Sequence, residues 1–153
     1  MLESLKKQYG ELASKYQLPS FTQVNADFEL EKIDHESECL MRTIRKCMMD
    51  KIVNSLSFFD MLLQPAQAPR LYLPFIRTMT QEDQEHIELL YKAFGTLSLQ
   101  CLTLELEYNE SAEASMVTRI FTVWQEERVR FLHLVTRIEH PIPFLKKEKS
   151  YFG

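Results

Sequence analysis

The stretch between Pro74 and Pro141 contains no other proline and only one glycine, Gly95. Apolar residues recur in it every three or four positions, in two separate series. This is the period of an amphipathic helix with one buried face. The series are Ile87, Leu90, Phe94, Leu97, Cys101, Leu104 and Tyr108, then Val117, Ile120, Trp124, Glu127, Phe131, Leu134 and Ile138. The pattern predicts two long helices, which are antiparallel neighbours because only the short polar segment 109–111 separates them.

Glycine is scarce along the whole chain. Three glycines occur in 153 residues, whereas an all-β fold needs many residues that tolerate tight turns. We therefore predict an all-α fold, an antiparallel bundle of four main helices with one or two short helices and an extended C-terminal tail. Residues 1–140 are expected to form the single bundle domain, and residues 141–153 a proline-interrupted basic and aromatic tail.

The N-terminal part of the chain supplies the other helices. Ser20, with Gln23 three residues later, has the spacing of a capping box at the start of a short helix. After this helix, residues 28–34 alternate apolar and acidic side chains, which indicates an extended connection. Helical periodicity predicts helices over 2–16, over 21–28 and from about 34 to 64.

Local signals mark the expected helix ends. Asp34 or Ser37 is expected to cap the third helix, and Thr80 begins the next long one, with acidic residues in its first turn. The segment 71–76 is unusually apolar, so a short helix is expected near Pro74, where it would close one end of the bundle.

Cysteine usage and charge limit the setting of the protein. The three cysteines form no Cys-x-x-Cys pair and lie in apolar stripes, so we interpret them as small core residues in a cytoplasmic protein. A formal net charge of −4 argues against nucleic acid as the main partner. No apolar run approaches the roughly 20 residues that cross a bilayer, so no membrane association is expected.

A di-metal carboxylate centre is the first catalytic site to consider for a four-helix core. Its ligands are a Glu-x-x-His motif on each of two helices and one glutamate from each of the other two. The sequence offers Asp83-x-x-His86 once, at a helix start, while Glu31 and His35 lie near a loop. We therefore expect neither metal ligands nor a cofactor.

Glu127 occupies an apolar position of the second series. A buried carboxylate must be paired, hydrogen-bonded or protonated, and such groups often mark functional sites. Tyr91, Tyr72 or Arg77 are candidate partners for it. In the alternative interpretation, Glu127 reaches the edge of the helix interface and Val123 fills the core.

The segment Arg128-Val-Arg-Phe-Leu-His133 places a histidine five residues after an arginine. This spacing resembles the catalytic signature of HEPN-type ribonucleases, which are also small helical bundles, although Val129 stands where that family often has a polar residue. The resemblance implies that Arg128 orients a scissile phosphate and that His133 acts as acid or base. Residues five apart differ by about 140° around a straight helix, so the two converge only in a kinked helix. The alternative is a solvated basic face.

A second basic cluster, Arg42, Arg45 and Lys46, lies early in the third helix. Because no aromatic residues are interleaved with these charges, we interpret the cluster as solvated. The alternative is a docking patch for an acidic protein or nucleic acid.

Apolar residues exceed what the helical stripes require. Ten phenylalanines and seven methionines indicate a wide core or an exposed apolar surface, and large exposed apolar patches are typical of binding surfaces. We predict a non-catalytic protein that acts through protein–protein interaction, as an adaptor, a regulator or a homo-oligomer. The expected binding residues are Tyr72, Phe75, Ile76, Phe144, Tyr151 and Phe152.

Two alternative functions stay open at this point. One is a ribonuclease-like enzyme, favoured if Arg128, His133 and Glu127 converge in one cleft. The other is a carrier of an apolar ligand, favoured if a cavity opens in the core. The residues expected around such a cavity are Phe58, Phe59, Phe94 and Trp124. For the tail, docking on the bundle and binding to a partner are both open.

Overall fold

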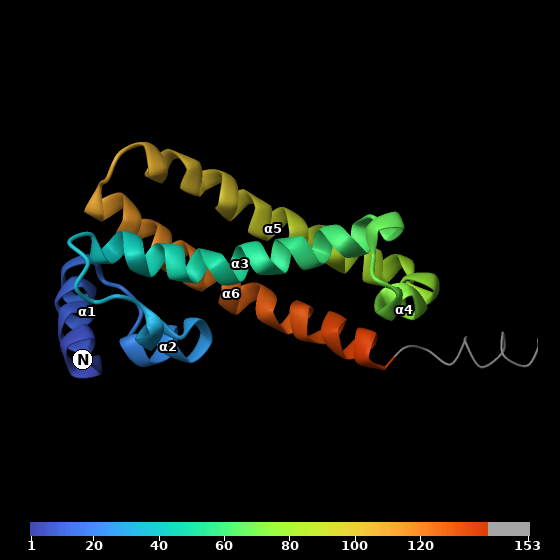
Figure 1. The fold of residues 1–153 in the computed structure, drawn as a ribbon, viewed down its shortest axis with the longest axis horizontal. Coiled ribbons are helices and arrows are strands. Elements are labelled where there is room, and N and C mark those ends of the chain that lie inside the picture. The colour runs from blue at the N-terminus through green and yellow to red at the C-terminus, as the bar shows by residue number, and fades with distance from the viewer. Residues whose placement is uncertain (141–153) are drawn as a thin grey trace, which may run out of the picture.

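The computed structural model describes residues 1–140, and helices account for most of this range. Three long helices pack on one another, α3 (Leu40–Leu63), α5 (Gln81–Leu106) and α6 (Glu110–Glu139). α5 runs antiparallel to both α3 and α6 (Figure 1). The predicted all-α bundle and the antiparallel pairing of the last two long helices are therefore confirmed.

Three shorter helices close the two ends of the bundle. α1 (Leu2–Tyr16) and α2 (Phe21–Phe28) lie at the end where α3 begins, and α1 lies across this end instead of along the bundle (Figure 1). α4 (Leu73–Thr78) lies at the opposite end, after the 3-10 turns η2 (Pro65–Gln67) and η3 (Arg70–Tyr72). The short helix expected near Pro74 is α4, with the proline in its first turn.

Two of the predicted helix starts are capped as expected. The Ser20 hydroxyl accepts the N–H of Gln23, and the Gln23 side chain accepts the N–H of Ser20. Thr80 and Asp83 form the same reciprocal pair at the start of α5. These contacts satisfy backbone donors that have no partner within the helix.

The start of α3 differs from the prediction. α3 begins at Leu40, and neither Asp34 nor Ser37 caps it. The Ser37 hydroxyl instead accepts the N–H of Cys39 in the turn that precedes the helix. A serine side chain readily accepts the backbone N–H two residues later in such a turn. Because the Ser37 hydroxyl is used in this way, it does not cap α3.

The connection after α2 is also compact, not extended as predicted. Leu30–Lys32 forms a single 3-10 turn, η1, and Leu30 is buried. Glu29 ends α2 in the left-handed conformation, and the Asn25 side chain accepts the N–H of Glu31. The Asn25 contact stabilises the turn, so the local alternation of apolar and acidic residues does not produce a strand.

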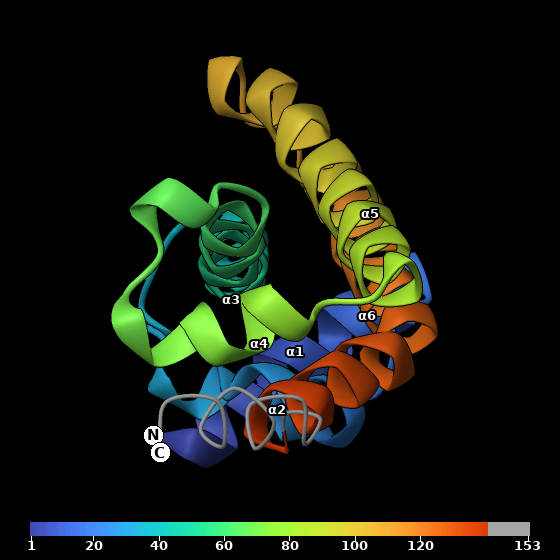
Figure 2. The ribbon, with the colours of Figure 1, turned by 90° about the vertical axis from the view of Figure 1, so that its right-hand side faces the viewer.

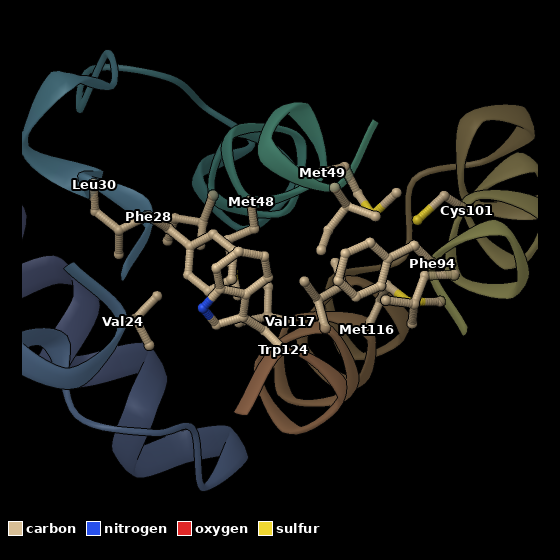
Figure 3. Packing of buried hydrophobic residues seen from close by; sticks show 14 of the residues in the cluster. Val24, Phe28, Leu30, Met48, Met49, Phe94, Cys101, Met116, Val117 and Trp124 are labelled. Carbon is tan, nitrogen blue, oxygen red and sulfur yellow. The ribbon is translucent and has the colours of Figure 1, made fainter. Parts of the chain in front are cut away.

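The core is built from aromatic and aliphatic side chains of all the long helices and of α2. Phe28 of α2, Trp124 of α6 and Phe94 of α5 lie in succession in Figure 3, with ring centres 5.7 Å and 5.9 Å apart. Burying each such side chain contributes roughly 1.5–3 kcal/mol to folding. This layer therefore holds α2 against α6 and, through Trp124, α6 against α5.

The basic cluster on α3 is mostly buried, which corrects the prediction that it is solvated. Arg45 is 2% exposed, and its Nε lies 2.7 Å from Oε2 of Glu113, which is fully buried. Arg45 also pairs with Glu105, and Arg42 donates a hydrogen bond to Glu113. Only Lys46 keeps a largely exposed side chain. These ion pairs join α3 to the end of α5 and the first turn of α6.

The buried ion pairs also perturb the ionisation of their members. Burial alone would lower the pKa of Arg45, but its hydrogen bonds to Glu113 and Glu105 outweigh burial and raise that pKa. The hydrogen bond from Arg45 holds the pKa of Glu105 below its usual value. Both groups are therefore charged at neutral pH, and the cluster is a structural network of charges.

Candidate functional site

An open groove runs between α3 and α6, on the side that α5 leaves uncovered. It consists of two hollows of about 490 Å³ and about 590 Å³, and Phe58 of α3 and Phe131 of α6 line both of them. α2 borders the first hollow and η3 borders the second. Figure 2 views the molecule from the end at which α4 lies. We call the two hollows together the α3–α6 groove.

Aromatic rings form the floor of the α3–α6 groove. The rings of Phe58 and Phe131 stack with centres 6.3 Å apart, and Tyr72 meets Phe58 edge-on at 5.8 Å. All three side chains are partly exposed. Aromatic side chains at an open surface offer a large apolar contact at low entropic cost, which suits them to anchor a partner.

The two ends of the groove differ in chemistry. Near α2, Lys51 donates a hydrogen bond to the backbone carbonyl of Asp27, and its ammonium lies 4.6 Å from the centre of the Trp124 ring. Near η3, the lining is apolar, and Leu71 is 80% exposed. The groove therefore combines one charged end, lined by Asp27 and Glu29 as well as Lys32 and Lys51, with one mostly apolar end beside the exposed Leu71 side chain.

Of the residues predicted to bind a partner, one lines the groove and others pack in or against the core. Tyr72 lines the groove as expected, whereas Phe75 is 1% exposed and forms part of the core. Phe75 is therefore unavailable to a partner, because the helical turn of α4 directs it inward. Ile76 is partly buried and packs against the core. The predicted residues Phe144, Tyr151 and Phe152 lie outside the described residues.

Several groove residues were missed by sequence reasoning. Phe131 and Ile138 belong to the apolar series of α6, so periodicity assigned them entirely to the core. Leu71 and Val135 carried no signal beyond their apolar character, although Leu71 lies beside Tyr72 in the same apolar segment. An unusually apolar segment between Pro69 and Pro74 is the one feature that could have indicated this part of the groove.

The candidate ribonuclease residues do not converge. The Arg128 side chain is about half exposed and lies 3.5 Å from the Asp27 carboxylate of α2. His133 is exposed, and its ring centre lies 5.7 Å from that of His86 on α5. α6 is one continuous helix through this region, so Arg128 and His133 project to different sides of it, as their spacing requires.

Glu127 lies at the edge of the α5–α6 interface. It is partly buried, and it forms an ion pair with Arg130 instead of with Tyr91, Tyr72 or Arg77. Val123 packs against the core in its place. This arrangement matches the second interpretation of the sequence, in which the charged group reaches the edge of the helix.

Asp83, the acidic residue of the candidate metal motif, already forms an ion pair and hydrogen bonds within the protein. It accepts hydrogen bonds from Arg137 of α6 and from the backbone of Thr80. Burial raises the pKa of Asp83, but these hydrogen bonds outweigh burial and hold that pKa below its usual value. Within residues 1–140, no group of three or more potential metal ligands is found.

The aromatic residues expected around an apolar-ligand cavity contact Phe131. The Phe131 ring lies 5.0 Å from Phe59, 6.4 Å from Phe94 and 6.2 Å from Trp124. These centre-to-centre distances are those of rings in direct contact. Phe131 therefore packs directly among the rings that were expected to surround such a cavity.

Comparisons with protein-family models, with curated proteins and with solved structures gave no match. In the part of the chain that the structure describes, no helix has the length and apolar character needed to cross a membrane.

Proposed function

We propose that the protein binds other proteins through the α3–α6 groove, and that the bound segment is an amphipathic helix. Such a helix would take the place of a fourth long helix, parallel to α3 and α6 at the side opposite α5. Helix-in-groove binding uses an apolar face with anchors spaced i, i+3, i+4 and i+7. The observation that carries the proposal is the row of partly exposed rings of Phe58, Tyr72 and Phe131.

The dimensions of the groove define the partner. Its wall on α6 runs from Phe131 to Glu139 in the second hollow, which is about 12 Å or just over two helical turns. The first hollow continues it toward α2. A helix of three to four turns fits this length, with large apolar side chains directed at Phe58 and Phe131.

The α2 end of the groove carries charges of both signs. Lys51 and Lys32 line it together with Asp27 and Glu29, so we expect polar or charged side chains of the partner helix there. The apolar face of the partner helix would lie against Leu71 and Tyr72 at the other end.

Site-specific photo-crosslinking of the full chain in its native cells tests this proposal. Benzoylphenylalanine replaces Leu71, which lines the groove, and in a matched control it replaces Val129, which is 72% exposed on α6 and does not line either hollow. Both positions are exposed, so neither substitution should perturb the fold. Mass spectrometry then identifies the crosslinked residues.

A crosslink from position 71 to a helical segment of a different protein, absent from position 129, is the expected result. Crosslinks to residues 141–153 of the same chain would overturn the proposal, because the groove would then be occupied from within. Equal crosslinking from the two positions would also overturn it, since the contact would not be specific to the groove.

A further inference from the structure

α5 carries a second apolar face in addition to its buried one. The buried face contains Ile87, Leu90, Phe94, Leu97, Cys101 and Leu104. A second row lies about 130° around the helix from the centre of that face, within an arc of about 80°. Its members are Tyr91, Gly95, Leu99, Leu102 and Leu106, and we call this row the α5 leucine stripe.

The α5 leucine stripe is open to solvent within residues 1–140. Leu99, Leu102 and Leu106 are 69%, 62% and 87% exposed. Single exposed leucines are ordinary, but a continuous apolar row on one helix face marks a contact surface. The C-terminal part of α5 is gold at the top of Figure 2. It contacts α3 through Glu105 on another face, so the stripe itself stays open to a second molecule.

We propose that the α5 leucine stripe is a dimer interface at which α5 of one copy packs antiparallel on α5 of a second copy. The two-fold axis passes between Ser98 and Leu99. This inference is independent of the groove, since no stripe residue lines either hollow. A two-fold arrangement uses the same patch on both molecules and closes on itself.

The spacing of the stripe suits pairing with itself. Gly95 and Leu102 are equidistant from the midpoint between Ser98 and Leu99, and so are Tyr91 and Leu106. In the antiparallel pair, Leu102 of one copy therefore lies opposite Gly95 of the other. Apart from its chain neighbours and the adjacent backbone of α5, nothing described lies within 4 Å of the position that a Gly95 Cβ would take, so this glycine leaves room for the incoming leucine.

Antiparallel pairing is favoured over parallel pairing by the same residues. In a parallel pair, Gly95 would meet Gly95 and leave a gap, and Leu102 would meet Leu102. In the antiparallel pair, Leu102 of each copy lies against Gly95 of the other, so a large side chain fills the space beside a small one at both places. This approaches the close packing of protein interiors. It also sets the two helix dipoles in opposite directions.

The C-terminal tail of the same chain is poorly placed to cover the stripe. α6 ends beside the start of α5, where Arg137 bonds to Asp83. Leu106 lies about 35 Å further along α5, so the far end of the stripe is well away from the last residue of α6. The symmetric spacing of the stripe fits a second copy along its whole length.

The stripe is short, so the dimer should be reversible. From Tyr91 to Leu106 it is about 23 Å long, which gives an interface below the standard size. We expect a dissociation constant of roughly tens of micromolar.

Sedimentation equilibrium of the full chain, from roughly 5 to 500 µM to bracket that value, tests the proposal. Leu102→Glu places a charge in the stripe, and Leu132→Glu makes the same change at a similarly exposed leucine of α6. The wild-type chain and Leu132→Glu should dimerise alike, while Leu102→Glu should weaken the dimer at least about tenfold. A wild-type chain that stays monomeric, or a dimer that Leu102→Glu leaves unchanged, would overturn the proposal.

Crosslinking resolves the orientation in a background of Cys39→Ser and Cys47→Ser. A short bismaleimide should join Tyr91→Cys to Leu106→Cys when the two proteins are mixed, and neither protein to itself. Self-linking of Leu106→Cys would instead show a parallel pair and would contradict the proposed geometry. Far-ultraviolet circular dichroism of each variant checks that the helices are intact.

Discussion

The Nε atom of Arg45 lies 2.7 Å from Oε2 of Glu113, and both side chains are buried. The two residues are 68 positions apart in the sequence. Their contact joins the beginning of α3 to the beginning of α6, at the end of the bundle where α5 terminates. It is therefore central to how the three long helices are held together.

Removing one member of this pair should be costly. Arg45→Met leaves the Glu113 carboxylate buried with fewer partners, so we expect a loss of roughly 3–5 kcal/mol of unfolding free energy. The double variant Arg45→Met with Glu113→Leu should lose less than the sum of the two single changes. Urea unfolding of the four proteins gives this double-mutant cycle.

Arg128→Met is the matched control for that cycle. Its ion pair with Asp27 is about half exposed on the arginine side, so the change should cost no more than about 1 kcal/mol. Strict additivity at Arg45 and Glu113 would show that the buried contact contributes no coupling, contrary to the geometry.

The stability of the protein should fall in acid. In the folded protein, burial raises the pKa of Asp83, but hydrogen bonds from Arg137 and Thr80 outweigh burial and lower it. The hydrogen bond from Arg45 lowers the pKa of Glu105. In the unfolded chain these groups titrate at about 4, so the unfolded chain binds more protons near that pH. The stabilisation is therefore complete above the unfolded pKa values and is lost as pH falls through the folded ones.

Thermal melts at a series of pH values measure this effect. The melting temperature should change little near neutrality and decline below about pH 5. Asp83→Asn should lower the melting temperature at neutral pH and reduce the steepness of the acidic decline. A melting temperature that stays constant from neutral to strongly acidic pH would contradict these assignments.

Phe131 should prove essential to the aromatic core. Phe131→Ala is expected to cost about 3 kcal/mol, because it removes a ring that contacts Phe59, Phe94 and Trp124. The change should also widen the open α3–α6 groove, because Phe131 lines both of its hollows. Urea unfolding measures the loss, and an unchanged free energy of unfolding would contradict these contacts.

The helices were predictable because their signals are local. The apolar periods of α5 and α6, and the capping pairs at Ser20 and Thr80, depend on residues within a few turns of one another. Such signals determine where a helix begins and which face it buries. They do not reveal which neighbour it meets.

The features that the sequence did not predict depend on which helices pack against one another. Arg45 looks like a surface residue until α6 brings Glu113 against it. Phe131 follows the core period, yet part of it faces the groove because α2 covers only one end of the α3–α6 interface. By contrast, the sequence already placed Leu99 and Leu102 outside the buried period of α5 as part of its apolar surplus, and both are exposed in the structure.

The affinity of the captured helix for the groove tests the central claim most directly. Isothermal titration calorimetry would compare the helix recovered at position 71 with three full chains: wild type, Leu71→Glu and Val129→Glu. Binding through the α3–α6 groove predicts that Leu71→Glu weakens the affinity at least about tenfold, because it places a carboxylate against an apolar surface. Val129→Glu should leave the affinity unchanged. Equal affinities for all three chains would contradict the account.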